Sequence, residues 1–477
     1  MRPTVKLFIN GTWRAGKDGE APVVDPATEQ ANGAVSLASP DDLDDAVSAA
    51  TAVQKTWGAT PAAERGAILQ RAASLLRERT PEIARELTLE QGKTLAESAS
   101  ELGRSVETLA WNGEEAGRVG GRSIPGRAAN STRTLVPAPV GVVAAFTAWN
   151  FPAVLVTRKL GAALAAGCPV VLKAAEEAPY TAAAIIQCLA DAGLPAGVVN
   201  LVFGDPPAVA RHLLSAPAVR KVTFTGSTRV GKELAKLAAP DLKRCTFELG
   251  GHAPVVLCED GKVDAAVAAT LAFKFTSAGQ SCIAPSRFFI HRARYAEFVD
   301  KFAGAAQAIK IGNGLESQTR MGPLANARRI AAMQRFMDDA VTAGSSLVTG
   351  RQHPDGAGFF WSPTVLAGVP DRALVMQEEP FGPIAPMAPF DEVEEAIQRA
   401  NAVPYGFAAY IYTQSSVLAA KFVAEIEAGN IGVNQMNPSL PDVPVGGLKD
   451  SGYGYEGGRE GIEAFQHMKL VSQTYLP

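Results

Sequence analysis

GVVAAFTAWNFPAVLVTRKLGAALAAGCPVVLKAA, residues 141–175, is the stretch that decides the fold of this chain. Its two short apolar runs, GVVAAFTAWN and PVVLKAA, flank the segment VTRKLGAALAAG, in which apolar residues recur at helical spacing. An apolar run without polar alternation is typical of a strand that is buried on both faces of a sheet. The stretch therefore predicts a strand, a helix and a second strand parallel to the first.

The same alternation continues on both sides of this stretch. Helical spacing in TAAAIIQCLADAG is followed by the apolar runs VVNLVFG, VRKVTFTGS and RCTFELGG, which predicts a doubly wound α/β domain. A second alternation, from APVVLCED (253–260) to RRIAAMQRFMDDAVTAG (328–344), predicts another α/β domain. Before residue 120 we expect a hairpin with an Asn10-Gly11 turn, and then long helices, the first capped by Ser39.

Length and composition exclude several classes of protein. The chain has 477 residues, which at roughly 100–200 residues per domain makes two or three packed units. A net charge of −3 argues against nucleic acid or an anionic membrane as the main partner. No apolar run approaches the roughly 20 residues of a membrane span, and the start MRPTVKLFINGTW does not look like a signal peptide. Five cysteines without CxxC spacing indicate neither a disulfide framework nor a metal site, so we expect a soluble, cytoplasmic protein.

Two segments are candidates for binding a dinucleotide phosphate. The pattern GxGxxG occurs at 452–457, but the residues before it are rich in turn formers, so we interpret it as a structural turn. VTFTGSTRVG is the better candidate, because an apolar strand ends at Thr225 and a helix begins near Thr228. The free N–H groups of that helix start, with the Ser227 hydroxyl, suit a pyrophosphate.

A lysine and an acid follow another strand of the same sheet. Lys173 and Glu176 in PVVLKAAEEAP could bind ribose hydroxyls, and Glu176 would repel a 2′-phosphate and so favour NAD over NADP. A solvated pair of charges in a loop is the alternative interpretation.

The stretch FTSAGQSCIAP contains the candidate nucleophile, Cys282. Free cysteines are mostly buried and inert, so other residues must argue for chemistry. Glu248 ends a predicted strand before two glycines, and Asn150 in TAWNFP ends another. A thiol, a carboxylate and an amide donor that converge could perform acyl transfer. The other four cysteines lie in apolar or helical runs, and no histidine has the spacing of a triad or a metal site.

These residues together make the chain resemble the aldehyde dehydrogenase superfamily over essentially its whole length. The motifs that carry the resemblance occur in the order of that family: TAWNFP, LKAAEEAP, FTGSTRVG, FELGGHAP, GQSC, EEPFGP and VGGLKDSGYG. The resemblance implies that Cys282 is the nucleophile, that Glu248 is the general base, and that Asn150 forms the oxyanion hole with the Cys282 N–H. It also implies binding of NAD, in preference to NADP, by Ala148, Trp149, Lys173, Glu176, Phe224, Gly226, Ser227, Leu249, Glu379 and Phe381.

The resemblance further implies three parts and an oligomer. The cofactor domain, Rossmann-like, would comprise residues 1–120 and 141–248, and a catalytic α/β domain would comprise 249–445. Residues 121–140 and 462–477 would form a small β arm for oligomerisation, and 446–461 would return to pack on the cofactor domain. We expect a homodimer or a homotetramer.

The resemblance is closest to the succinate-semialdehyde dehydrogenases, which points to a small acid aldehyde as substrate. Arg158 matches the arginine that holds the substrate carboxylate in those enzymes, and we expect Ser281 and Ser439 beside it. A second arginine of those enzymes is replaced by Thr276, which we also place at the substrate, so the pocket could instead accept neutral aliphatic or aromatic aldehydes. An acylating enzyme is disfavoured because Glu248 is present, and a catalytically silent structural member because Cys282, Glu248 and Asn150 are intact.

Overall fold

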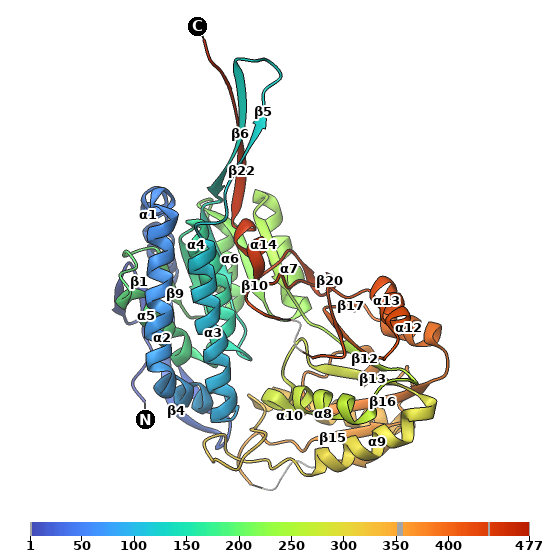
Figure 1. Cartoon of the computed structure of the whole chain (residues 1–477). Helices are drawn as coiled ribbons and strands as arrows, with labels where there is room; N and C mark the ends of the chain where they lie inside the picture. The colour runs from blue at the N-terminus through green and yellow to red at the C-terminus, as the bar shows by residue number, and fades with distance from the viewer. Residues whose placement is uncertain (1, 351–355, 437–438, 477) are drawn as a thin grey trace.

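The computed structural model describes residues 2–350, 356–436 and 439–476. Two sheets, each packed against helices, form the body of the molecule, and a narrow three-stranded sheet projects from it beside the C-terminus (Figure 1). Among the residues described, no helix has both the length and the hydrophobicity to cross a membrane. The predicted α/β class is confirmed.

The first sheet has eight strands in the order β2-β1-β9-β8-β7-β10-β11-β21. Its central strands, from β9 to β11, run parallel, as the continuous apolar runs predicted. Short antiparallel strands lie at both edges, and the hairpin at one edge turns through Asn10 and Gly11, both at positive φ. The strands are β1 (Leu7–Ile9), β2 (Thr12–Arg14), β7 (Val142–Phe146), β8 (Val170–Lys173), β9 (Val199–Val202), β10 (Val219–Thr225), β11 (Arg244–Glu248) and β21 (Gly452–Tyr453).

Helices on both sides of this sheet complete a doubly wound unit. Ser39 caps the first helix through a capping box with Asp42, as predicted in part from the sequence. The helices are α1 (Pro40–Ala59), α2 (Ala62–Gln91), α3 (Leu95–Glu115), α4 (Pro152–Ala166), α5 (Pro179–Asp191), α6 (Pro206–Ser215) and α7 (Thr228–Ala238), followed by the short η1 (Ala239–Asp241).

The second sheet has seven strands in the order β14-β15-β16-β13-β12-β18-β19, mostly parallel. The strands are β12 (Ala253–Leu257), β13 (Pro285–His291), β14 (Ser346–Thr349), β15 (Thr364–Ala367), β16 (Ile384–Phe390), β18 (Ala408–Tyr412) and β19 (Asn430–Val433). Its helices are α8 (Val263–Phe275), α9 (Arg292–Gln307), α10 (Ala327–Thr342), α11 (Leu374–Gln377), α12 (Val393–Asn401) and α13 (Ser416–Glu425), with the short η2 (Thr276–Gly279) after α8.

The projecting sheet joins two distant parts of the chain. Strand β6 (Ser131–Pro139) lies between β5 (Arg122–Pro125) and β22 (Gln466–Thr474), which precedes the C-terminus (Figure 1). The remaining elements are β3 (Glu20–Asp25), β4 (Gln30–Ser36), β17 (Tyr405–Gly406), β20 (Leu448–Lys449) and α14 (Gly458–Glu463). The exact residue boundaries of the three parts stay a prediction.

The GxGxxG pattern at 452–457 begins in an edge strand rather than in a βαβ unit. Strand β21 pairs antiparallel with β11, and a Cβ on Gly452 would lie 2.0 Å from the Phe247 carbonyl oxygen. Glycine is required there because the two backbones approach closely, so the pattern has a structural cause.

Candidate active site

The candidate catalytic residues meet at the carboxyl ends of three adjacent strands, β7, β10 and β11. Thr225 pairs with Glu248 at the last step of β10 and β11, so Glu248 lies at the edge where ligands bind in such sheets. Asn150 does not end a strand, as the sequence suggested, because β7 stops at Phe146 and Asn150 lies in the loop before α4. The loop between η2 and β13 brings Cys282 to the same place from the second unit.

Gln280 holds the loop that carries Cys282. Its buried side-chain amide donates to the Ser277 carbonyl at 2.9 Å and accepts from the Ala325 N–H at 3.0 Å. The Asn150 amide donates to the Gln280 carbonyl at 3.0 Å, which ties the loop to the first sheet. A Cβ on Gly251 would lie 2.2 Å from the Cys282 carbonyl oxygen, so only glycine allows this approach. The thiol is therefore carried by a rigid loop.

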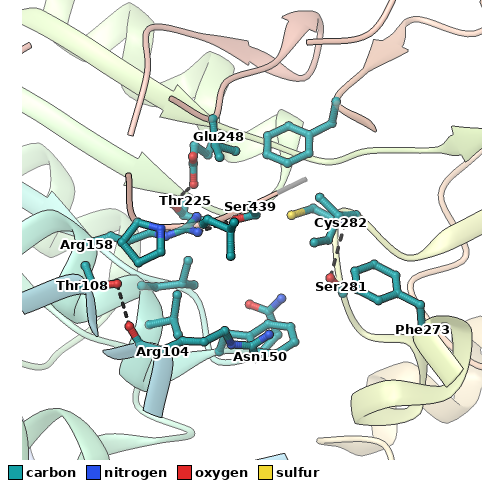
Figure 2. Close-up of a pocket in the computed structure, with 18 residues that line it drawn as sticks. Arg104, Thr108, Asn150, Arg158, Thr225, Glu248, Phe273, Ser281, Cys282 and Ser439 are labelled. Carbon is teal, nitrogen blue, oxygen red and sulfur yellow. Dashed lines mark hydrogen bonds between the residues drawn. The ribbon is translucent and has the colours of Figure 1, made fainter. Parts of the chain in front are cut away.

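Cys282 lies where a small cavity meets a larger cleft. The cavity has a volume of about 90 Å³ and the cleft about 590 Å³, and Asn150, Thr225 and Cys282 line both. Figure 2 shows Glu248, Asn150, Arg158 and Cys282 around the small cavity. Its lining residues are Arg104, Thr108, Asn150, Phe151, Val154, Leu155, Arg158, Thr225, Glu248, Phe273, Ser281, Cys282, Ile283, Phe407, Ser439, Leu440, Pro441 and Val445. A small substrate fits the cavity, and the cleft has room for a much longer ligand.

Most of the residues predicted to bind the cofactor line the larger cleft. They are Ala148, Trp149, Gly226, Ser227, Leu249, Glu379 and Phe381. The rings of Trp149 and Phe381 meet edge to face at 5.7 Å, and Glu379 accepts the Gly251 N–H at 3.1 Å. These contacts give the wall of the cleft a fixed shape.

Three predicted cofactor residues lie outside this lining. Lys173 and Glu176 form an ion pair at 2.5 Å, and Glu176 lines an adjoining cavity that shares Asn326 and Arg328 with the cleft. Phe224 is buried beneath Gly226, where a Cβ would lie 2.3 Å from its ring. The Phe224 ring therefore packs against the turn at Gly226 that precedes α7.

Of the predicted substrate residues, Arg158, Ser281 and Ser439 line the small cavity, and the Arg158 guanidinium donates to the Ser439 hydroxyl. Residues 437–438 of the predicted substrate segment lie outside the described residues. Thr276, also predicted at the substrate, is not among the residues that line the small cavity. Its hydroxyl donates back to the Ala272 carbonyl at 2.8 Å at the end of α8.

Sequence reasoning missed three charged residues around the site. Arg104 of α3 lines the small cavity, although its spacing in the sequence looks like that of an ordinary helix surface residue. Lys159 and Glu456 form a buried ion pair behind Glu248, and both contact the Thr223 hydroxyl, at 3.2 and 3.1 Å. Nothing local in the sequence joins residues so far apart.

Comparison with known proteins identifies this arrangement. Residues 13–471 match the model of the aldehyde dehydrogenase family. The chain belongs to the aldehyde dehydrogenase family. It is 49% identical to a 4-(hydroxymethyl)benzenesulfonate dehydrogenase of Comamonas testosteroni, over 98% of this chain and 97% of that one. It is 39% identical to the succinate-semialdehyde dehydrogenase (NADP(+)) of Escherichia coli, with the same coverage.

Solved structures agree with this assignment. The succinate-semialdehyde dehydrogenase of Burkholderia pseudomallei superposes with a TM-score of 0.97 at 39% identity, covering 99% of this chain and 98% of that one. The chain is thus an oxidoreductase of the aldehyde dehydrogenase type, and enzymes of this family use NAD(P).

The larger cleft of this aldehyde dehydrogenase fits a nicotinamide dinucleotide. Ser227 caps α7 and lines the cleft, so the free N–H groups of this helix start are available to an anion there. Arg229, Arg328 and Arg329 line the same cleft and add positive charge for a pyrophosphate. Cys282 at the inner end would place bound substrate beside the cofactor.

Glu248 of this aldehyde dehydrogenase has the environment of a base that is active near neutral pH. Burial and, to a lesser extent, the charge of Glu456 raise the pKa of Glu248 to about 8, against the opposing charges of Arg158 and Lys159. One oxygen receives the Thr225 hydroxyl at 3.4 Å, while the other is buried without a partner among the described residues.

The Cys282 thiol is protonated in this state of the enzyme. Burial raises its pKa, the carboxylates of Glu248 and Glu379 raise it further, and the charge of Arg158 lowers it. The thiol must therefore lose its proton to a base before it can attack an aldehyde.

A buried ion pair supports the backbone of Asn150. Lys93 pairs with Glu101 at almost complete burial, and the Lys93 ammonium also donates to the Asn150 carbonyl at 2.9 Å. The other Glu101 oxygen accepts the N–H groups of Ala153 and Val154, in the first turn of α4, at 2.8 and 3.2 Å. This pair thereby fixes the chain on both sides of Phe151.

Lys93→Met is expected to lower the free energy of unfolding by about 3–5 kcal/mol, because it leaves the Glu101 charge buried without its partner. Urea unfolding followed by circular dichroism measures the change. Lys236→Met is the matched control, since Lys236 and its partner Glu233 are 71% and 58% exposed, and it should cost no more than about 1 kcal/mol. An equal, small effect of both substitutions would contradict the role given to Lys93.

Proposed function

We propose that this aldehyde dehydrogenase oxidises an aldehyde that carries an acidic group, such as succinic semialdehyde, to the corresponding acid with NAD. The observation that carries the proposal is Arg158. Its half-buried guanidinium lines the cavity that contains Cys282, and among the described residues its side chain has Ser439 as hydrogen-bond partner and no acidic partner. An arginine in such a position can hold a carboxylate through two parallel hydrogen bonds.

The first step is addition of Cys282 to the aldehyde. The thiol gives its proton to solvent, its sulfur bonds to the aldehyde carbon, and the carbonyl oxygen becomes an oxyanion. The Asn150 amide and the Cys282 N–H are proposed to stabilise this oxyanion, with about 3–4 kcal/mol expected from each donor. In this structure the Asn150 amide donates to the Gln280 carbonyl in the same loop, so it is already held close to Cys282.

Oxidation then converts the adduct into a thioester. NAD bound in the larger cleft would supply the acceptor for the hydride that leaves the former aldehyde carbon. An aldehyde has no other leaving group, which explains why the two cavities share Cys282. The chain itself contributes the position of the sulfur and the donors to the oxyanion.

Hydrolysis of the thioester completes the reaction. Glu248 is proposed to take a proton from water, whose oxygen attacks the thioester carbon and releases the acid and the Cys282 thiol. The buried, unpartnered oxygen of Glu248 supports this role. Lys159 and Glu456 behind it keep that oxygen in a polar, charged environment.

The relatives support an acidic substrate but differ in its acid. One relative is named for a benzenesulfonate and two are named for succinate semialdehyde. The compounds in these names therefore carry either a sulfonate or a carboxylate group. The aromatic rings of Phe151, Phe273 and Phe407 in the cavity wall would suit either an aryl ring or a short chain. A neutral aliphatic or aromatic aldehyde is the alternative substrate, and a catalytically silent protein is the alternative from another class.

A steady-state screen separates these possibilities. The substrates are succinic semialdehyde, 4-carboxybenzaldehyde and 4-formylbenzenesulfonate, each beside a neutral analogue, butyraldehyde or benzaldehyde, with NAD and NADP in parallel. A higher kcat/KM for the acids supports the proposal. Better turnover of the neutral analogues would overturn it, and absence of turnover with all of them would favour the silent protein.

The preference for NAD is proposed to depend on Glu176, which accepts the Gly204 N–H at 2.9 Å and pairs with Lys173. Glu176→Gln is expected to raise kcat/KM with NADP relative to NAD by roughly tenfold, because a carboxylate near the ribose repels a 2′-phosphate. Glu297→Gln, at an exposed acid of α9 that lines neither the cleft nor the adjoining cavity, is the control and should leave the ratio unchanged. The role of Glu176 is wrong if the wild-type enzyme prefers NADP, the cofactor named for the Escherichia coli relative.

We also propose that the projecting sheet mediates a homodimer or homotetramer in the cytoplasm. Met468, Leu470 and Val471 of β22 expose apolar side chains on it, which supports burial against another subunit. Light scattering after gel filtration measures the mass of the assembly, and a monomer would contradict this proposal.

A further inference from the structure

Arg104 lines the small cavity and has no acidic partner among the residues that the structure describes. Among the described residues its side chain forms no ion pair and no hydrogen bond, and its Nε is buried and unsatisfied. Its guanidinium carbon lies over the Phe151 ring, 5.8 Å from the ring centre, and this aromatic contact gives the guanidinium no hydrogen-bond acceptor. A guanidinium has five donors, and buried donors without acceptors destabilise a protein. An anionic ligand would satisfy them.

Arg104 and Arg158 reach the cavity from two adjacent helices. Arg104 and Thr108 lie one turn apart on the same face of α3, and both line the cavity. Phe151, Val154, Leu155 and Arg158 follow the same helical spacing at the start of α4. The contacts of Glu101 with the first turn of α4 hold the two helices together. Figure 2 shows Arg104 near Asn150 and Arg158 near Ser439, both among the residues around the cavity.

The charge balance of the cavity is positive. Its lining contains two arginines and one acid, Glu248. Burial raises the pKa of that acid to about 8, so near neutral pH it is largely uncharged. The Ser439 hydroxyl accepts a hydrogen bond from the Arg158 guanidinium, while the Arg104 guanidinium has no hydrogen-bond acceptor among the described residues. The cavity therefore has more positive charge and more donors than a single carboxylate needs.

Building on the proposed function, we infer that Arg104 determines specificity by binding the acidic group of the substrate together with Arg158, and that a sulfonate uses it more fully than a carboxylate. A carboxylate has two oxygens, which Arg158 and Ser439 can occupy. A sulfonate has a third oxygen and can accept hydrogen bonds from a second guanidinium. The three aromatic rings of the cavity wall would hold an aryl ring between the acid and the aldehyde.

The test is the response of three matched aryl aldehydes to Arg104→Met, which keeps length and removes charge. We expect kcat/KM to fall about tenfold or more for 4-formylbenzenesulfonate, less for 4-carboxybenzaldehyde, and less than about twofold for benzaldehyde, mainly through KM. Arg104→Lys should recover part of the loss. Arg118→Met is the control, since Arg118 lies near the end of α3 with its side chain 63% exposed and should change nothing.

Binding of 4-methylbenzenesulfonate, an anion that cannot react, gives a second readout by calorimetry. We expect wild-type enzyme to bind it about tenfold or more tightly than the Arg104→Met variant does. Equal affinity of the two, or a parallel loss of kcat/KM for all three aldehydes, would overturn the inference. If the wild-type enzyme oxidised none of the aldehydes but the affinities still differed, the proposed function would fail while the anion site would stand.

Discussion

Cys282→Ala is expected to abolish aldehyde oxidation, with a loss in kcat of at least about 10,000-fold. The methyl group of alanine cannot form the thioester, and without that covalent intermediate the hydride has no carbon adduct from which to leave. No second cysteine lines either cavity among the described residues, so no neighbouring thiol can substitute. The measurement is the rate of NADH formation with saturating succinic semialdehyde and NAD.

Cys245→Ala is the matched control for this loss. Cys245 is half-buried, like Cys282, but lies in β11 and does not line the cavities. We expect its replacement to leave kcat within about twofold, since it touches no reacting atom. Oxidation that survives in Cys282→Ala but not in Cys245→Ala would move the nucleophile to another residue.

Glu248→Gln is expected to stop the enzyme after one turnover. The amide cannot take a proton from water, so hydrolysis should slow by about 100- to 10,000-fold while hydride transfer still occurs once. Rapid mixing should then show a burst of NADH equal to the number of active sites, followed by almost no further formation. Glu233→Gln on the exposed face of α7 is the control and should turn over normally.

The pH dependence gives the same assignment an independent test. Because the pKa of Glu248 is raised to about 8, the active carboxylate form increases as pH rises through this value. The steady-state rate of the wild-type enzyme should therefore rise with pH through about 8 when hydrolysis limits it, and the residual rate of Glu248→Gln should lose this dependence. A rate that falls over this range would contradict the role of Glu248 as base.

Much of the fold follows from local sequence because strand, cap and turn signals agree. The apolar runs of β7 and β8 have no polar alternation, and the structure buries every residue of both strands in the centre of a parallel sheet. Glu248 could be placed at the ligand-binding edge of the sheet because it ends a parallel strand, whereas Asn150 lies in the loop after β7. Both features, the buried strands and the position of Glu248, follow from the local hydrophobic pattern of the sequence and from the topology of parallel sheets.

The substrate side could not be predicted in the same way. The prediction that Thr276 lies at the substrate came from the family resemblance, and between Thr276 and Cys282 the residues Ser277 and Ala278 adopt positive φ and turn the chain sharply. Such conformations are uncommon for residues other than glycine, so no propensity indicates them. The position of Arg104 in the cavity could not be predicted either. Whether an arginine on a helix faces solvent or a cavity depends on the tertiary packing of α3.

The most direct test of the account is the mass of the Glu248→Gln enzyme after mixing with succinic semialdehyde and NAD. Acid quenching, digestion and mass spectrometry should find the succinyl group as a thioester on the peptide that contains Cys282, in proportion to the NADH formed. Without NAD the peptide should be unmodified, because the thiohemiacetal reverses. NADH formation with no acyl group on Cys282, or with the group on another residue, would contradict the central claim.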